Sequence, residues 1–214
     1  MAALRHCLPL LALLTRTAAQ IFGCDDPAVL PASADGRQNP AGAHHGYVEW
    51  WFFTTFSPKS DVGLALSYNA AHRGVSAMVY LHASHPARAS VEHYHASFST
   101  VTSTPDNATA HWDASNNVVV VDEKTYIVRG SMGGASWTLR YEQAVDACRE
   151  HVDILKNFIK LDWVAYMPSA KVTGTLTLNG TTFDLSDATG YHDHNSGRVS
   201  AASASESPTR KVPR

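Results

Sequence analysis

The sequence has little charge, only three cysteines and no long apolar run. Charged side chains make up 17% of its 214 residues, below the roughly 25% typical of globular proteins. The 17 basic and 19 acidic residues give a net charge of -2, whereas nucleic-acid binders usually carry a basic excess. Apolar residues make up 44%, too many for a disordered chain. We therefore expect a globular protein with no nucleic-acid partner and no membrane span.

Several common catalytic motifs are also missing. The sequence contains no G-x-S-x-G elbow, no G-x-G-x-x-G fingerprint and no phosphate-binding loop, so hydrolase triads, dinucleotide cofactors and phosphoryl transfer have no support. We predict no cofactor. The chemistry that stays open needs only a shaped apolar cavity and one or two groups that transfer protons.

Residues 1–19 have the layout of a secretory signal peptide. Arg5 and His6 give a positive start, residues 8–14 are apolar, and small residues precede Gln20. The apolar run is far shorter than the ~20 residues that span a bilayer, which makes a retained anchor the weaker alternative. We expect cleavage after Ala19 and a protein that is secreted or held in the lumen of the secretory pathway.

Two further features agree with secretion. Asn107 and Asn179 each begin an N-glycosylation sequon. Cys7 would leave with the signal peptide, so Cys24 and Cys148 remain as one possible disulfide, with two unpaired buried thiols as the alternative.

The remaining chain divides into three parts. Residues 20–45 are rich in Ala, Pro, Gly and Asp and look extended, and residues 46–195 form the predicted domain. Within it, short β-branched or aromatic runs alternate with turn residues, which is typical of an all-β antiparallel sandwich or barrel. Residues 143–157 have weak helical spacing and are the one predicted helix. Residues 196–214 are serine-rich and without aromatics, and we expect a disordered tail.

The clearest predicted hairpin is Lys171–Leu185. Asn179-Gly180 supplies the two positive-φ positions of a type I′ turn. In that register Leu176, Leu178, Phe183 and Leu185 share one face, which we expect to be buried, and the sequon at Asn179 lies at the exposed tip.

The first candidate site is the run Tyr47–Phe53 (YVEWWFF). In a strand, Tyr47, Glu49, Trp51 and Phe53 share one face. A carboxylate flanked by aromatic rings is poorly solvated, which raises its pKa and suits it to donate a proton. The alternative is that Glu49 pairs with a basic group and only stabilises the sheet.

The second candidate site is Tyr191-His192-Asp193-His194-Asn195. As a strand it places Tyr191, Asp193 and Asn195 on one face and both histidines on the other. Asp193 could then act as a proton-transfer group whose charge balance the histidines set.

Other histidines offer weaker candidates. The pair His192 and His194 could instead begin a metal site, with Glu49, His82, His93 or His95 as further ligands by residue type alone. No spacing matches a zinc pattern, so we predict no metal. His82 ends an apolar strand and could point into a pocket.

The two motifs together resemble the lipocalin-like carotenoid hydratase (hydroxyneurosporene synthase) family, whose fungal relatives include Diels–Alderases and hetero-Diels–Alderases. The resemblance rests on Tyr47–Phe52 and Gly190–Asn195 and covers residues 41–195. It implies a lipocalin-like β domain whose pocket takes a small apolar metabolite, such as a polyketide, a terpenoid or a polyene. The signal peptide and the sequons look more like the secreted fungal branch.

The resemblance implies a cofactor-independent cyclase of fungal secondary metabolism as the leading function. A polyene or terpenoid hydratase or isomerase is the second hypothesis, and a non-catalytic carrier of a hydrophobic ligand, or an inactive truncated product, is the third. It also implies catalytic roles for Asp193, Glu49 and Tyr191, and a substrate pocket that includes Trp51, His82, His192 and His194.

The sequence departs from the family after Asn195. The family motif continues as Asn-Trp-Gly into a second domain, whereas here Ser196-Gly197 leads into the serine-rich stretch. We therefore expect a chain truncated to the first domain. Val199-Ser200 is what a common intron donor encodes in frame, which makes intron read-through a testable explanation.

Overall fold

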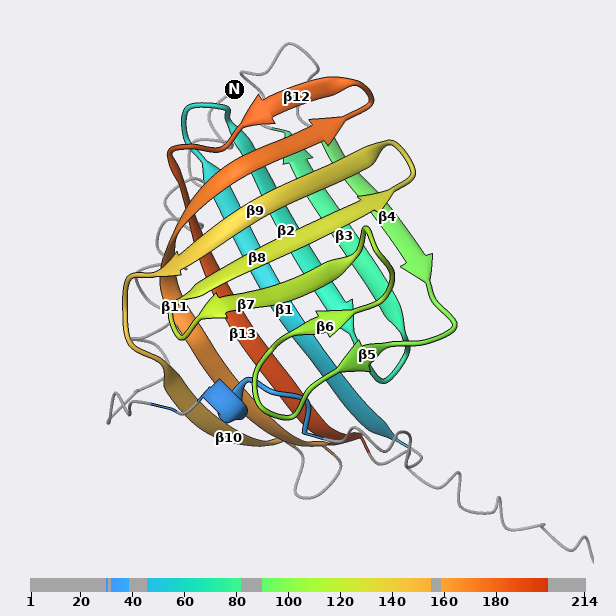
Figure 1. Cartoon of the computed structure of the whole chain (residues 1–214), viewed down its shortest axis with the longest axis vertical. Helices are drawn as coiled ribbons and strands as arrows, with labels where there is room; N and C mark the ends of the chain where they lie inside the picture. Colours follow the sequence, from blue (N-terminus) through green and yellow to red (C-terminus); the bar gives the residue numbers. More distant parts are fainter. Residues whose placement is uncertain (1–29, 31, 39–45, 82–89, 155–158, 200–214) are drawn as a thin grey trace, which may run out of the picture.

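The computed structural model describes residues 30, 32–38, 46–81, 90–154 and 159–199 (Figure 1). Apart from the short 3₁₀ turn η2 (Ala32–Ala34), every regular element described is a β-strand. The strands are β1 (Tyr47–Ser57), β2 (Val62–Asn69), β3 (Gly74–Leu81), β4 (Ser90–Ser97), β5 (Thr102–Ser103), β6 (Ala110–His111), β7 (Asn117–Asp122), β8 (Thr125–Met132), β9 (Ala135–Gln143), β10 (Cys148–Ile154), β11 (Ile159–Leu178), β12 (Thr181–Asp184) and β13 (Ala188–Val199). The predicted all-β antiparallel class is confirmed. Among these residues, no helix is long and apolar enough to cross a membrane.

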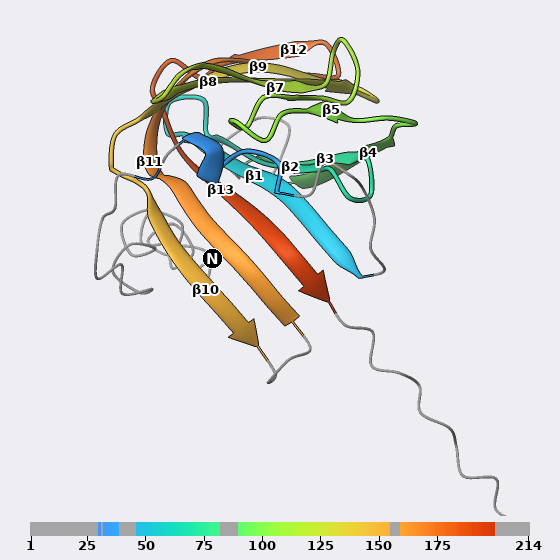
Figure 2. The same ribbon diagram turned by 60° about the horizontal axis from the view of Figure 1, so that its bottom comes forward.

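All the strands belong to one antiparallel sheet. Its order is β4-β3-β2-β1-β13-β11-β9-β8-β7-β6-β5, and the long strand β11 pairs β10 with its first half and β12 with its last residues. The sheet curls into a half-barrel, so that β7, β8, β9 and β12 lie over β1, β2 and β3 (Figures 1 and 2). The part of the sheet made by β10, β11, β13 and β1 continues beyond this double layer (Figure 2).

Alternation in β1 decides which side chains enter the half-barrel. Glu49, Trp51, Phe53, Thr55 and Ser57 are buried, and the residues between them are half-buried. We call the side of β1 and β13 that carries these buried residues the inner face, and the opposite side the outer face. The shared face predicted for Glu49, Trp51 and Phe53 is therefore confirmed.

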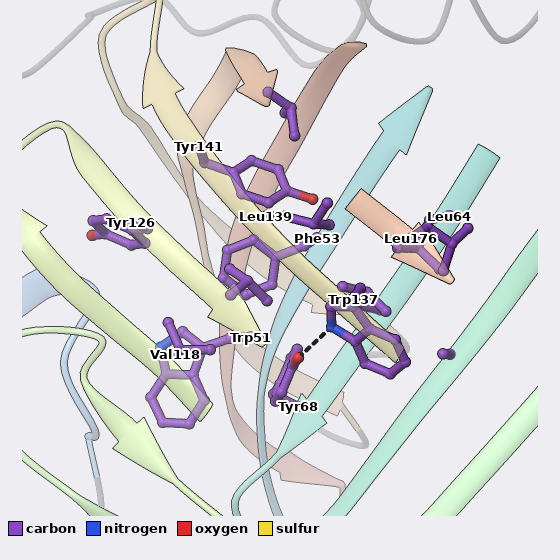
Figure 3. Close-up of a cluster of buried hydrophobic side chains, with 14 of the residues drawn as sticks. Trp51, Phe53, Leu64, Tyr68, Val118, Tyr126, Trp137, Leu139, Tyr141 and Leu176 are labelled. Atoms are coloured by element: carbon purple, nitrogen blue, oxygen red, sulfur yellow. Dashed lines mark hydrogen bonds between the residues drawn. The ribbon is translucent and has the colours of Figure 1, made fainter. Parts of the chain in front are cut away.

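The core between the two layers is strongly aromatic (Figure 3). Phe53 packs edge-on against Tyr68, with ring centroids 6.0 Å apart, and Tyr141 lies 5.2 Å from the same ring. The Trp137 indole N–H donates to the Tyr68 hydroxyl at 2.8 Å, and that hydroxyl donates to the Arg129 carbonyl at 2.6 Å. These buried polar atoms are thus paired, which spares the aromatic residues an uncompensated desolvation cost.

The hairpin of β11 and β12 forms as predicted. Asn179 and Gly180 have φ values of 48° and 84°, as a type I′ turn requires. Leu176 lies opposite Phe183 in the register, and both are buried together with Leu178 and Leu185.

Two predictions about local structure are wrong, one about the type of an element and one about where the last strand ends. Instead of a helix over 143–157, β9 ends at Gln143 and residues 148–154 form β10, which pairs with β11 from Cys148 opposite Ala165. Residues 196–199, assigned to a disordered tail, continue β13, because β1 pairs with it as far as Arg198 and β11 as far as Val199. The rest of the predicted tail, the signal peptide and His82 lie outside the described residues.

A close contact between β8 and β9 gives a first prediction. A Cβ added at Gly130 would lie 1.9 Å from Cζ2 of Trp137, whereas one added at Gly63 would meet nothing nearer than 3.5 Å. Because Trp137 is 3% exposed and hydrogen-bonded, it cannot move aside freely. Gly130→Ala should lower the free energy of unfolding by about 1–3 kcal/mol, measured by urea denaturation. Gly63→Ala is the control, and equal losses for the two would contradict the packing argument.

Candidate functional site

The second motif forms the middle of β13, between β1 and β11. Its side chains alternate as predicted. His192 and His194 lie opposite Phe53 and Trp51 on the inner face and stack on those rings, with centroids 4.0 Å and 4.9 Å apart. Asp193 pairs with Phe52 of β1 and points to the outer face. The three candidates implied to be catalytic are therefore split, because Asp193 and Tyr191 lie on one side of the sheet and Glu49 on the other.

Asp193 accepts hydrogen bonds from three side chains on the outer face. The Trp163 indole N–H and the Tyr191 hydroxyl donate to Oδ2 at 3.0 Å and 2.7 Å. The Asn195 amide donates to Oδ1 at 2.5 Å. Trp163 reaches this position because it lies opposite Asn195 in the register of β11 and β13. The carboxyl group is thus held in one orientation.

Burial controls the acidity of this group. Asp193 is 6% exposed, and the loss of solvation raises its pKa above the ordinary aspartate value. The Tyr191 hydroxyl, the His192 charge, the Trp163 indole and the Asn195 amide oppose this shift without cancelling it. Burial and the nearby Asp193 charge also raise the pKa of Tyr191, so Tyr191 stays a neutral donor. Asp193 can therefore hold a proton at a higher pH than a solvated aspartate.

Several aromatic side chains on or beside the outer face of β13 are not fully covered. Trp50 and Phe52 of β1, Trp163 of β11 and Tyr191 of β13 are all half-buried. The outer face therefore combines partly accessible aromatic surface with one protonatable carboxyl group. A small apolar molecule that covers these rings would lie next to Asp193.

The inner face carries a second and fully buried set of charged groups. Glu49, at 0% exposure, faces His194 Nε2 at 3.2 Å and Arg37 Nε at 3.7 Å, and its Oε1 accepts the backbone N–H of Gln38 at 2.6 Å. This agrees with the alternative in which Glu49 pairs with basic groups inside the sheet. The rings that stack on the two histidines, Trp51 and Phe53, are fully buried, whereas those bonded to Asp193 are half-buried. Substrate contact is therefore less favourable here than on the outer face.

The structure adds two residues that the sequence did not single out. Trp163 binds the candidate acid, and Asp35, in the Ala- and Gly-rich entry segment, binds His192 at 2.8 Å. The alternation of β11 identifies the face of Trp163 only once its register with β13 is known. For Asp35 there is no local signal, since its partner is 157 residues away in the sequence.

The other predicted positions have simple places in the fold. Asn179 is exposed at the hairpin tip, while Asn107 is half-buried and accepts the Thr109 backbone N–H at 2.8 Å. Cys148 is buried at the start of β10, but Cys24 lies outside the described residues, so their disulfide stays a prediction. Within the part of the chain that is described, no three His, Cys, Asp or Glu side chains are grouped to hold a metal ion.

No protein-family model and no curated protein matches the chain, but solved structures do. Kievitone hydratase from Nectria haematococca matches 82% of this chain at 14% identity with a TM-score of 0.50. A Nitrosomonas europaea structure named for AttH matches 81% at 15% identity with a TM-score of 0.48, and CghA matches 80% at 13% identity with a TM-score of 0.48. The chain spans 58%, 58% and 52% of the lengths of these three structures. It therefore shares its lipocalin-like β fold with the kievitone hydratase structure.

Proposed function

We propose that the chain is a proton-transfer enzyme of the hydratase type, acting at Asp193 on a carbon–carbon double bond of a small apolar substrate. The observation that carries the proposal is a carboxyl group of raised pKa that is hydrogen-bonded to Trp163 and Tyr191, on a face that also carries the half-buried rings of Trp50 and Phe52. The fold shared with kievitone hydratase supports the same chemistry.

Each part of the site has a function in this reaction. Asp193 gives its proton to one carbon of the double bond, and the aromatic faces of Trp50, Trp163 and Tyr191 stabilise the positive charge that develops on the other. The Tyr191 hydroxyl and the Trp163 indole stabilise the carboxylate left behind. Water adds to the cationic carbon, and the proton it loses restores Asp193. The net change is the addition of one water molecule.

The second candidate is a cyclase that uses the same carboxyl group without net proton transfer. Three hydrogen bonds fix the Asp193 carboxyl group, so in its protonated form it could polarise a substrate carbonyl while the outer-face rings hold the reacting ends together. The product would then be an isomer of the substrate. A carrier is the non-catalytic alternative, and it would change no bond.

We further propose that the protein acts in the secretory pathway or outside the cell. The support for this is the signal-peptide layout of residues 1–19 and the two sequons. A small apolar metabolite is the partner class that the outer-face rings favour.

Deletion of the gene in the source organism, followed by mass-resolved metabolite profiling, tests the proposal and identifies the substrate in the same experiment. A hydratase predicts that the deletion strain accumulates a compound one water lighter than the compound it loses. Wild-type sequence, but not Asp193→Asn, should restore the product. Accumulation of an isomer of equal mass would favour the cyclase, and an unchanged set of compounds would contradict both enzymes and favour the carrier.

A further inference from the structure

The short segment before β1 places the Asp35 carboxylate on the inner face of β13, on the side opposite the proposed acid, Asp193. Asp35 follows η2 and lies on the inner face, with an exposure of 0%. Its Oδ2 is 2.8 Å from Nε2 of His192 and accepts the Tyr126 hydroxyl at 2.7 Å, while its backbone carbonyl accepts the Trp51 indole at 2.8 Å. The segment is fixed to β1, β8 and β13 by these bonds.

The surroundings of His192 suit a ring that carries two protons. Nδ1 faces the Phe52 carbonyl at 3.0 Å, and Nε2 faces the Asp35 carboxylate at 2.8 Å. A carbonyl and a carboxylate can only accept, so a ring with an N–H on both sides satisfies both partners. With Asp35 ionised, that ring is an imidazolium, and the pair lies at a place with no exposed surface.

His194 repeats the arrangement one position further along the inner face. Its Nδ1 faces the Ala34 carbonyl at 3.4 Å, and its Nε2 faces Glu49 at 3.2 Å. Asp35 Oδ1 also lies 3.8 Å from the same Nδ1. Two rings near carboxylates from other elements thus lie directly before and after Asp193 in β13, on the side of the strand that Asp193 does not occupy.

We propose that the buried pair of Asp35 and His192 behind β13 sets the proton affinity of Asp193 through the sheet. This inference rests on the proposed function in one respect, that Asp193 is the acid. Asp35 is then a positioning residue, since it acts through His192 and touches no substrate. Because side chains alternate along β13, the proposed acid lies on its outer face, and the histidine that influences the proton affinity of this acid lies on its inner face.

The electrostatics of the buried groups agree with this geometry. Burial alone would lower the pKa of His192, but the Asp35 charge and hydrogen bond, the Phe52 carbonyl and Asp193 together raise it. The His192 charge in turn opposes the rise that burial causes in the pKa of Asp193. Charges separated only by the thickness of a strand interact strongly where water is excluded.

The described groups around these two residues are few. On the outer face, Tyr191 is the titratable partner of Asp193, and Trp163 and Asn195 are neutral donors. On the inner face, His192 meets Asp35, and its ring also contacts Tyr126 and Tyr166 at centroid distances of 5.3 Å and 6.4 Å. Among the described groups on the inner face, Asp35 is therefore the anion that faces the His192 ring.

The wild-type full chain provides a test that needs no substitution. In ¹⁵N NMR, His192 should carry protons on both ring nitrogens at pH 7. In ¹³C NMR, the Asp193 carboxyl carbon should show a second inflection at the pH at which His192 loses its proton, as coupled groups do. A neutral His192 ring at pH 7, or an Asp193 titration without that inflection, would overturn the inference.

Two substitutions, one of Asp35 and one of its hydrogen-bond donor Tyr126, sharpen the test. Asp35→Asn removes the anion, so His192 should lose its charge and the pKa of Asp193 should rise by about one unit. Tyr126→Phe removes a hydrogen bond to the same Asp35 oxygen but no charge, and should leave the Asp193 titration in place. If Asp193 titrated identically in Asp35→Asn and in the wild type, the proposed coupling of Asp193 to the Asp35–His192 pair would be refuted. Because no substrate is needed, this result is separate from the turnover test of the proposed function.

Discussion

Asp193→Asn should lower turnover by about 10²–10⁴-fold while leaving the fold intact. The substitution keeps the size of the side chain, and its carbonyl oxygen can still accept a hydrogen bond from Trp163, Tyr191 or Asn195. It removes the carboxyl proton that Asp193 donates to the substrate in the proposed reaction. In the wild type, turnover should fall as the pH rises through the raised pKa of Asp193, because only the protonated form donates. The measurement is the rate of product formation for the substrate found by metabolite profiling.

The matched control is an aspartate close to the start of the same strand. Asp187 is exposed, bonds to Ser57 and to the Lys59 backbone N–H, and has a pKa below the ordinary value because of these hydrogen bonds. Asp187→Asn should leave turnover unchanged. If Asp193→Asn retained the full rate, the outer face would act by shape alone, and the proposal that Asp193 transfers a proton would be wrong.

The arrangement of the motif could be predicted because a strand has a period of two. Once residues 47–53 and 191–195 are recognised as strands, the opposite directions of Asp193 and His192 follow without a structure. The structure adds that β1 and β13 are neighbours, so both alternations continue across the pair and Phe53 stacks on His192. The prediction that Glu49 and Asp193 both act in catalysis rests on the family resemblance rather than on alternation. The register of β1 and β13 places them on opposite faces of the sheet.

Two features could not be predicted, for opposite reasons. The sequence of β10 is ambiguous because the spacing of four between Cys148 and Val152 fits one turn of a helix as well as two periods of a strand. Its pairing with β11, the next strand along the chain, decides between them. The role of Asp35 has no trace in the sequence because its burial depends on groups from β8 and β13 that no local pattern places beside it.

Trp51→Ala should be the most destabilising single truncation in β1, at about 3–5 kcal/mol. The Trp51 ring is fully buried, lies edge-on to Trp112 with centroids 5.9 Å apart, and stacks on His194. Its indole N–H also donates to the Asp35 carbonyl at 2.8 Å. The truncation therefore leaves a cavity and removes the bond that holds the Asp35 segment against β1. Urea denaturation followed by far-UV circular dichroism measures the loss.

The neighbouring tryptophan separates stability from ligand binding. Trp50 is half-buried on the outer face, so Trp50→Ala should cost about 1 kcal/mol or less in stability. On the proposed function it should instead weaken binding of the apolar substrate, because it removes one of the rings on the outer face, opposite Asn195. In Trp51→Ala protein that stays folded, the change in the free energy of substrate binding should be smaller than the loss in the free energy of unfolding. If both variants lost the same stability and neither affected binding, the outer face would have no part in substrate contact, and the division between a reactive outer face and a supporting inner face would fail.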